Sequence, residues 1–271
     1  MKICLALIHN NNTQRNAYIQ PRLAELRAGL SRQFSATSIE VAFQPEIKPH
    51  GLPMAFLRDV IYQAVDRDWR RYRHLRPPLL PLHVASFMRR VLKNKRYAGG
   101  GWKRSSFIET AVTDKHIRIW STFLESDADY LLCCEDDVIF KGDSVQRVND
   151  LLEMLICREG DAPIYIDLAG GCRFDEIKID ALEVGRDVSF RFYSKPVTNT
   201  ACAYLMSRSL VVAFHEILTR KPWLRLIGID WMMNKLFMLM ENDGMACACM
   251  HADPTIFKHG TTTGDYVAWE R

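Results

Sequence analysis

The sequence predicts an α/β fold, because segments with strand character alternate with segments of helical periodicity. Residues 2–8 form a short apolar run, the pattern of a strand buried on both faces of a parallel sheet. A helix ending near Arg32 is expected next, with leucines at helical spacing, and residues 38–43 then alternate as a second strand. A strand–helix–strand beginning of this kind indicates helices packed on a sheet.

Residues 44–108 interrupt this alternation and are expected to form a basic, partly helical insert. Helices are predicted near 54–67 and at 83–94, and prolines and a glycine triplet separate them from their neighbours. Between Asp66 and Arg104 the chain has 12 Lys and Arg residues against two Asp residues. The net charge of +4 of the whole chain therefore comes from this insert.

Regular alternation of helices and strands returns after the insert. Ser207 is expected to cap a helix that follows a strand at 197–206. The other expected elements are helices at 110–126, 143–158 and 231–240, strands at 129–134, 163–168 and 246–250, and an antiparallel strand at 187–193. A chain of 271 residues suits one large domain, so residues 1–271 are predicted to form a single domain that contains the insert.

The composition is that of a folded protein in a reducing compartment. Hydrophobic residues make up 48% of the chain and charged residues 25%, which excludes a disordered protein. None of the eight cysteines has the CxxC spacing of a zinc or redox site, and buried reduced thiols are expected. The apolar run at the N-terminus is too short for a signal peptide, and no run reaches the roughly 18 apolar residues of a membrane span. A cytoplasmic location is therefore expected, with at most peripheral contact with a membrane.

Three adjacent carboxylates, Glu135, Asp136 and Asp137, follow the strand at 129–134. Parallel strands of an open sheet hold ligands at their carboxyl ends, so these side chains are expected in a crevice. Solvent or a cation can relieve their mutual repulsion, and Mg²⁺ and Mn²⁺ prefer carboxylate oxygens and often share coordination with substrate phosphates. On the tripeptide alone, a metal site and a solvated loop that caps the next helix are equal alternatives.

The residues around the tripeptide resemble glycosyltransferase family 25, the lipooligosaccharide-type β-glycosyltransferases. In that family a Glu lies seven residues before the His of a Ser-His pair, and a helix and a hydrophobic strand then lead to Glu-Asp-Asp-Val. Glu109 and His116 keep that spacing here, with Lys115 in place of the Ser, and residues 135–138 read Glu-Asp-Asp-Val.

Two later segments carry the same resemblance. Residues 203–207, Ala-Tyr-Leu-Met-Ser, are similar to the "AYLIS" strand-to-helix passage of the family, and Asp230 stands where the family has the aspartate of a "PVD" motif. The resemblance covers about residues 105–235, whereas the first strand and helix match weakly and the insert has no counterpart.

The resemblance implies the GT-A fold, a Rossmann-like sheet that binds a nucleotide-sugar. It implies an inverting, metal-dependent transfer from a nucleotide-sugar, with a UDP-type donor favoured, to a glycan or lipid-linked saccharide. The implied cofactor is Mn²⁺ or Mg²⁺, with Asp137 as the main metal ligand, Asp136 as an intermediate case and His259 from the C-terminal region as a further ligand. Glu135 is the implied contact to the sugar-nucleotide.

An inverting transfer also needs a base for the acceptor hydroxyl, and Asp230 is the candidate. Its apolar neighbours can raise its pKa, and Trp231 can stack on an acceptor sugar. The alternative for Asp230 is that it only caps the following helix. Further candidates for donor binding are Asn10, Thr13, Arg15, Glu109, His116 and Lys258, each of which is alternatively an ordinary surface or helix-packing residue.

The basic insert leaves several interpretations open. It can lie on an anionic membrane surface, form a lid over an anionic acceptor or the donor phosphates, or be a solvated subdomain. Basic residues mixed with aromatics also suit nucleic acid, so a metal-dependent nuclease or nucleotidyltransferase is a rival function, although a nucleic-acid partner is not favoured. A catalytically inactive binding protein on the same fold is a third alternative.

Overall fold

The computed structural model describes residues 1–30, 32, 34–42, 52–76, 101–157, 162–182 and 190–266. Side chains within these ranges are described except at 39–42, 52–56, 59 and 101–108. Residues 77–100 of the basic insert, which include the helix predicted at 83–94, therefore lie outside the described residues.

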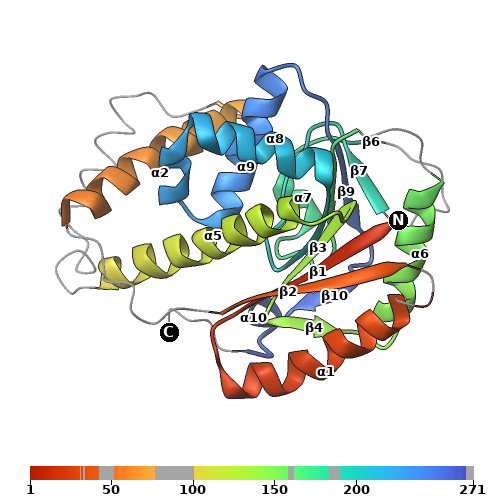
Figure 1. Ribbon diagram of the computed structural model, residues 1–271. Helices are drawn as coiled ribbons and strands as arrows, with labels where there is room; N and C mark the ends of the chain where they lie inside the picture. The colour runs from red at the N-terminus through yellow and green to blue at the C-terminus, as the bar shows by residue number, and fades with distance from the viewer. Residues whose placement is uncertain are drawn as a thin grey trace.

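The described elements alternate along the chain as an α/β protein requires (Figure 1). The strands are β1 (Lys2–His9), β2 (Ser35–Ala42), β3 (Tyr130–Glu135), β4 (Val138–Phe140), β5 (Ile164–Asp167), β6 (Ala181–Leu182), β7 (Phe190–Tyr193), β8 (Ala203–Ser207), β9 (Ala248–Ala252) and β10 (Phe257–His259). The helices are α1 (Thr13–Leu30), α2 (Leu52–Tyr72), α5 (Gly101–Glu125), α6 (Ser144–Ile156), α7 (Phe174–Ile177), α8 (Arg208–Arg220), α9 (Ile229–Asn242) and α10 (Gly260–Thr263), with a 3₁₀ turn η1 at Pro222–Leu226.

Eight of these strands form one mixed sheet in the order β2-β1-β3-β8-β5-β9-β7-β6. The pairs β1–β2, β1–β3 and β5–β9 are parallel, whereas β8 runs antiparallel to both of its neighbours, β3 and β5. The first residues of β8 therefore lie at the same edge as the last residues of β3 and β5. The remaining strands, β4 and β10, form a separate antiparallel pair beside this edge.

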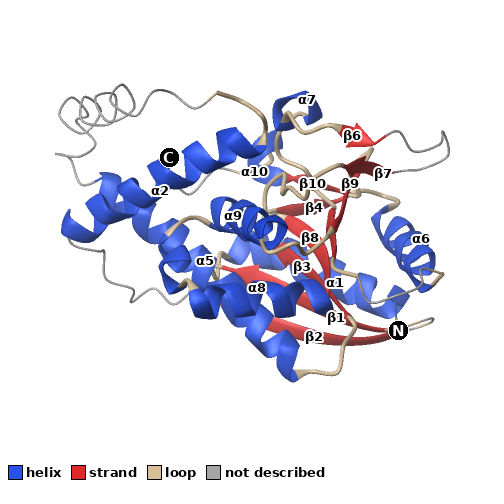
Figure 2. Cartoon of the chain, turned by 90° about the horizontal axis from the view of Figure 1, so that it is seen from above, coloured by secondary structure: helices blue, strands red, loops and turns tan. Residues whose placement is uncertain are grey.

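Helices cover both faces of the large sheet (Figures 1 and 2), and the alternation of side chains along β1 explains how. Ile3 and Leu5 lie in a buried apolar cluster that also contains side chains of α1 and α6. Cys4 and Ala6 point to the opposite face, into a cluster with side chains of α2, α5, α8 and α9. Successive side chains of a strand point to opposite faces, so an all-apolar strand such as β1 needs a helical layer on each side.

The α/β fold class is confirmed, and a mixed sheet flanked by helices is consistent with the GT-A fold. β7 is antiparallel to β9, as expected for residues 187–193. Ser207 caps α8, because its hydroxyl accepts a hydrogen bond from the amide of Leu210. The helix predicted at 110–126 instead begins at Gly101, so the end of the insert belongs to α5. None of the helices that the structure describes is long and apolar enough to cross a membrane.

Candidate active site at the end of β3

The acidic tripeptide lies where β3 ends and turns into β4. Each of its three carboxylates has a different partner. Glu135 meets a histidine of α5, Asp136 meets an arginine of α1, and Asp137 meets side chains from the loop before β8 and from β10. Three neighbouring carboxyl groups are tolerated here because each has its own partner. Arg15 comes from the first helix of the chain, and His259 comes from the last strand that the structure describes.

Asp136 anchors the loop between β1 and α1. Arg15 donates a hydrogen bond from Nη1 to Asp136 Oδ1 over 2.8 Å, and both side chains are buried. The amide of Asn10 donates to the other oxygen of Asp136 over 3.1 Å. The amide nitrogen of the Asn10 side chain is buried without a hydrogen-bond partner among the described residues, whereas Thr13 is exposed at the first turn of α1.

Glu135 ends a chain of buried side chains that are joined by hydrogen bonds. Its Oε1 lies 3.0 Å from Nε2 of His116, and Nδ1 of His116 lies 2.7 Å from the hydroxyl of Tyr204. Trp120 donates from its indole nitrogen to the same hydroxyl over 3.1 Å. Burial lowers the pKa of His116 to about 3, so its ring is neutral. Burial, reinforced by the charge of Asp137, raises the pKa of Glu135 to about 8.

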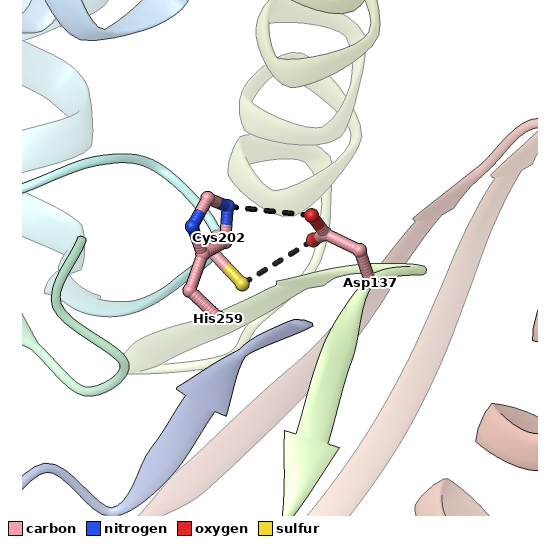
Figure 3. A group of neighbouring side chains, drawn as sticks. All are labelled: Asp137, Cys202 and His259. Carbon is pink, nitrogen blue, oxygen red and sulfur yellow. Dashed lines mark hydrogen bonds and ion pairs between the residues drawn. The ribbon is translucent and has the colours of Figure 1, made fainter. Parts of the chain in front are cut away.

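Asp137, Cys202 and His259 form a compact group of potential metal ligands (Figure 3). One ligand atom from each residue lies within 4.8 Å of those of the other two, and no other such group of three occurs among the described residues. His259 Nε2 lies 3.3 Å from Asp137 Oδ2, and the thiol of Cys202 donates to Asp137 Oδ1 over 3.4 Å. Carboxylate oxygen, thiol sulfur and imidazole nitrogen are all ligands of divalent metals, so the residues present fit such an ion.

The topology explains why residues so far apart in the sequence meet. β4 and β10 pair with His259 opposite Val138, the residue after Asp137, and the amide of Gly260 donates to the carbonyl of Asp137 over 2.9 Å. Gly260 is required by this approach, because a Cβ there would lie 2.6 Å from that carbonyl oxygen. Cys202 arrives from the other side, where the antiparallel start of β8 lets its carbonyl accept a hydrogen bond from the amide of Glu135.

Asp137 and His259 shift each other's pKa in opposite directions. Burial alone would raise the pKa of Asp137, but the hydrogen bond and charge of His259, together with the hydroxyl of Thr261, outweigh it and lower that pKa to about 2. Burial alone would lower the pKa of His259, and the Asp137 carboxylate reverses this and raises it. Asp137 is therefore an anion at neutral pH and is suited to bind a cation.

Asp230 lies in the first turn of α9. Its Oδ1 is buried without a hydrogen bond among the described residues. The helix is capped at Gly228, and no side-chain capping bond forms, so a simple capping role does not describe Asp230. Burial, followed by the charge of Glu135, raises its pKa to about 6, which means that Asp230 lies close enough to the tripeptide for their charges to interact.

Glu109 and Tyr62 hold the start of α9 in place. Arg58 of α2 forms an ion pair with Glu109, and the hydroxyl of Tyr62 donates to Glu109 over 3.0 Å and accepts from the amide of Gly228 over 2.5 Å. Tyr62 also packs edge-on against the half-buried ring of Trp231, with ring centroids 6.0 Å apart.

The structure thus brings some predicted residues together and separates others. The group at the end of β3 contains Glu135, Asp137 and His259, with Asp230 nearby. Asp136 does not join the potential metal ligands, because Arg15 and the Asn10 amide occupy its oxygens. The predicted donor contacts of Glu109, His116 and Lys258 stay predictions. Glu109 supports α9, His116 is fully buried beneath Glu135, and Lys258 is exposed on β10 between Phe257 and His259.

Sequence reasoning did not find Cys202 or Thr261. Cys202 is a single cysteine with no ligand spacing around it, and its position depends on the antiparallel direction of β8. Thr261 donates from its hydroxyl to Asp137 Oδ2 over 2.6 Å. Its place depends on the pairing of β4 with β10, two three-residue strands too short to show a pattern in the sequence.

Comparisons with known proteins add little to this picture. No protein-family model matches the chain, and no curated protein sequence matches it either. One solved structure that is similar is described as that of a glycosyltransferase involved in the glycosylation of the major capsid of PBCV-1. It shares 8% sequence identity and a TM-score of 0.41, over 94% of this chain and 82% of that one. A likeness of this size assigns neither a family nor an activity to the chain.

Proposed function

We propose that this protein is a metal-dependent glycosyltransferase that moves a sugar from a nucleotide-sugar to an acceptor hydroxyl. The observation that carries the proposal is a pair of carboxylates in contrasting environments near the end of β3. Asp137 is ionised and has potential metal ligands beside it, whereas Asp230 has a raised pKa and one buried oxygen without a hydrogen bond among the described residues. Two carboxylates whose environments push their pKa values apart are typical of a site that uses one for charge and the other for proton transfer.

The donor side is assigned to Asp137 and His259, which would hold a divalent cation, with Glu135 facing the sugar or ribose. A bound cation would stabilise the negative charge that grows on the diphosphate leaving group. Thr261 orients the Asp137 carboxylate by its hydrogen bond, and Arg15 with Asp136 fixes the loop that carries Asn10. The side-chain nitrogen of Asn10, which has no hydrogen-bond partner among the described residues, is suited to donate to a nucleotide base or ribose, with a UDP-type donor favoured.

The acceptor side is assigned to the start of α9. Asp230 takes the proton from the acceptor hydroxyl as that oxygen attacks the sugar carbon, which inverts the configuration there. A pKa of about 6 leaves Asp230 mostly ionised at neutral pH, yet basic enough to accept a proton. Trp231, next to it and half-buried, offers a ring face for an acceptor sugar, such as that of a glycan or a lipid-linked saccharide.

The resemblance to family 25 supports the same assignment, and nothing among the described residues favours the rival nucleic-acid function. Five arginines of the insert, at positions 67, 70, 71, 73 and 76, lie at the end of α2 and just beyond it. Among them Arg70 pairs with Asp66, and Arg71 lies 3.8 Å from Asp68. Contact of the insert with a membrane, the location in the cytoplasm and the single-domain organisation stay predictions.

The decisive experiment is a thermal-shift screen of nucleotide-sugars with and without a divalent metal. We expect one donor to raise the melting temperature only when the metal is present, because the diphosphate and Asp137 share the ion. UDP alone with metal should give part of that shift. If no nucleotide-sugar stabilises the protein under any metal condition, the proposed activity is wrong.

A further inference from the structure

Cys202 gives the potential metal site a sulfur ligand, which the acidic tripeptide alone would not provide. Its thiol is buried and directed at Asp137 (Figure 3), and it comes from the loop before β8, whereas His259 ends β10. The cysteine belongs to a three-residue group whose ligand atoms all lie within 4.8 Å of one another.

The spacing of the three side chains allows one ion to bind between them. Ligand atoms at the usual distances of about 2.0–2.3 Å from one tetrahedral metal lie roughly 3.3–3.8 Å from each other. Oδ2 of Asp137 lies 3.3 Å from Nε2 of His259, and its other oxygen, Oδ1, lies 3.4 Å from the sulfur of Cys202. One ligand atom from each of the three residues lies within 4.8 Å of the other two. Three protein ligands also leave a fourth position open, as in catalytic rather than structural metal sites.

The surrounding residues already orient these ligands. Thr262 forms a hydrogen bond with Nδ1 of His259, which leaves Nε2 to face the site. Thr261 fixes one oxygen of Asp137, and the amide of Glu135 fixes the backbone of Cys202. Groups behind the ligands that set ring tautomer and orientation are a regular feature of metal sites in proteins.

We infer that Cys202 is a direct metal ligand and that it makes the site select a borderline transition metal such as Zn²⁺ or Co²⁺ over Mn²⁺, and exclude Mg²⁺. Thiolate and imidazole ligands favour Zn²⁺ and Co²⁺, whereas Mg²⁺ requires oxygen ligands in octahedral geometry. The order of divalent affinities at such sites also places Mn²⁺ below Co²⁺ and Zn²⁺. On binding, the metal–sulfur bond forms as the thiol proton leaves to solvent.

This inference names the metal that the proposed glycosyltransferase would use. It rests on the proposed function only for the role of the metal in a reaction. The metal preference itself can be measured without a nucleotide-sugar. If Cys202 does not bind the metal while a donor still stabilises the protein with Mn²⁺, the inference fails and the proposed function stands. If the metal preference is found but no donor binds, the inference about Cys202 stands and the proposed function fails.

The test is a spectroscopic titration of the purified full-length protein with Co²⁺. We expect a sulfur-to-cobalt charge-transfer band in the near ultraviolet and tetrahedral d–d bands in the visible region. Zn²⁺ should abolish these bands at near-stoichiometric amounts, Mn²⁺ only in large excess, and Mg²⁺ not at all. Absence of the charge-transfer band at saturating Co²⁺, or its loss on adding Mg²⁺, would overturn the inference without any variant.

Matched cysteine variants identify which sulfur atom binds the metal. Cys202→Ser should lose the charge-transfer band and bind Zn²⁺ roughly a hundredfold more weakly, with a loss of about tenfold or less for Mn²⁺. Cys157→Ser and Cys172→Ser remove exposed thiols and should keep the wild-type spectrum. An equal loss of Zn²⁺ and Mn²⁺ affinity in folded Cys202→Ser, or a band that depends on Cys157 or Cys172, would contradict a direct role for Cys202.

Discussion

The two carboxylates of the candidate site, at the end of β3 and at the start of α9, differ in how they are supported. Asp137 is surrounded by His259, Thr261 and Cys202, and its pKa is lowered to about 2. Asp230 has a buried oxygen without a partner among the described residues, and its pKa is raised to about 6. Hydrogen bonds to a carboxylate thus lower its pKa, whereas burial without them raises it, which is the contrast on which the two proposed roles depend.

The largest effect that distinguishes the two is expected from Asp230→Asn. Loss of the proposed base should lower the rate of sugar transfer by roughly 10²- to 10⁴-fold, while the metal-dependent thermal shift with the donor is retained. Glu241→Gln, an exposed carboxylate near the other end of α9, is the control and should transfer normally. Near-normal turnover in Asp230→Asn would remove the residue from the chemistry.

Asp137→Asn should show the opposite pattern, because the loss is then in metal binding. We expect the affinity for the divalent metal, measured by calorimetric titration, to fall by at least about a hundredfold. Asp136→Asn is the informative comparison, since the sequence placed both residues at the metal. It should lower stability by breaking the buried pair with Arg15 and leave metal affinity within a few-fold. Loss of metal binding in a folded Asp136→Asn protein would reverse the assignment.

The raised pKa of Asp230 makes a prediction about stability. The carboxyl titrates at an ordinary value of 3.8 when unfolded and at about 6 in the fold. Its neutral form therefore favours folding below pH 4, and this contribution is lost as the pH rises through 6. Asp230→Asn should be more stable than the wild type at pH 8 by on the order of 2 kcal/mol, and no more stable at pH 3.5. Chemical denaturation at the two pH values measures this difference, and an equal gain at both would contradict it.

The smallest effect is expected for Thr261→Val, which keeps the size of the side chain and removes its hydrogen bond to Asp137. Metal affinity should fall by about tenfold, because the residue orients a ligand without binding the ion. Thr263→Val, in the same short helix, lacks that contact and should bind the metal as the wild type does. Equal affinities in all three proteins would mean that Asp137 needs no orienting group.

Much of the fold could be predicted from the sequence, because long apolar strands and amphipathic helices have strong periodic signals. β1, β3 and α9 lie close to their expected positions. The tripeptide at the end of β3 was recognisable from its position after an apolar strand, and Asp230 was singled out by the resemblance to family 25. These are features in which the neighbours along the chain determine the environment.

The rest depends on contacts between distant segments. Nothing in the sequence around Cys202 indicates that β8 runs antiparallel between β3 and β5, yet that direction places the thiol beside Asp137. Likewise, His116 and Glu109 keep a recognisable spacing on one helix, but they serve different places, one beneath Glu135 and the other at the start of α9. Spacing along a helix does not tell which neighbour each residue meets.

The antiparallel course of β8 also limits how this site can change. The single loop before it, residues 197–202, contacts two separate strand ends. Cys202 meets Asp137 after β3, while the amide of Asn199 donates to Asp167 at the end of β5. Insertions or deletions in this loop would alter both ends together. Changes in loop length are therefore expected to be better tolerated in the segments after β10 and before α1, because each of these segments reaches the site independently.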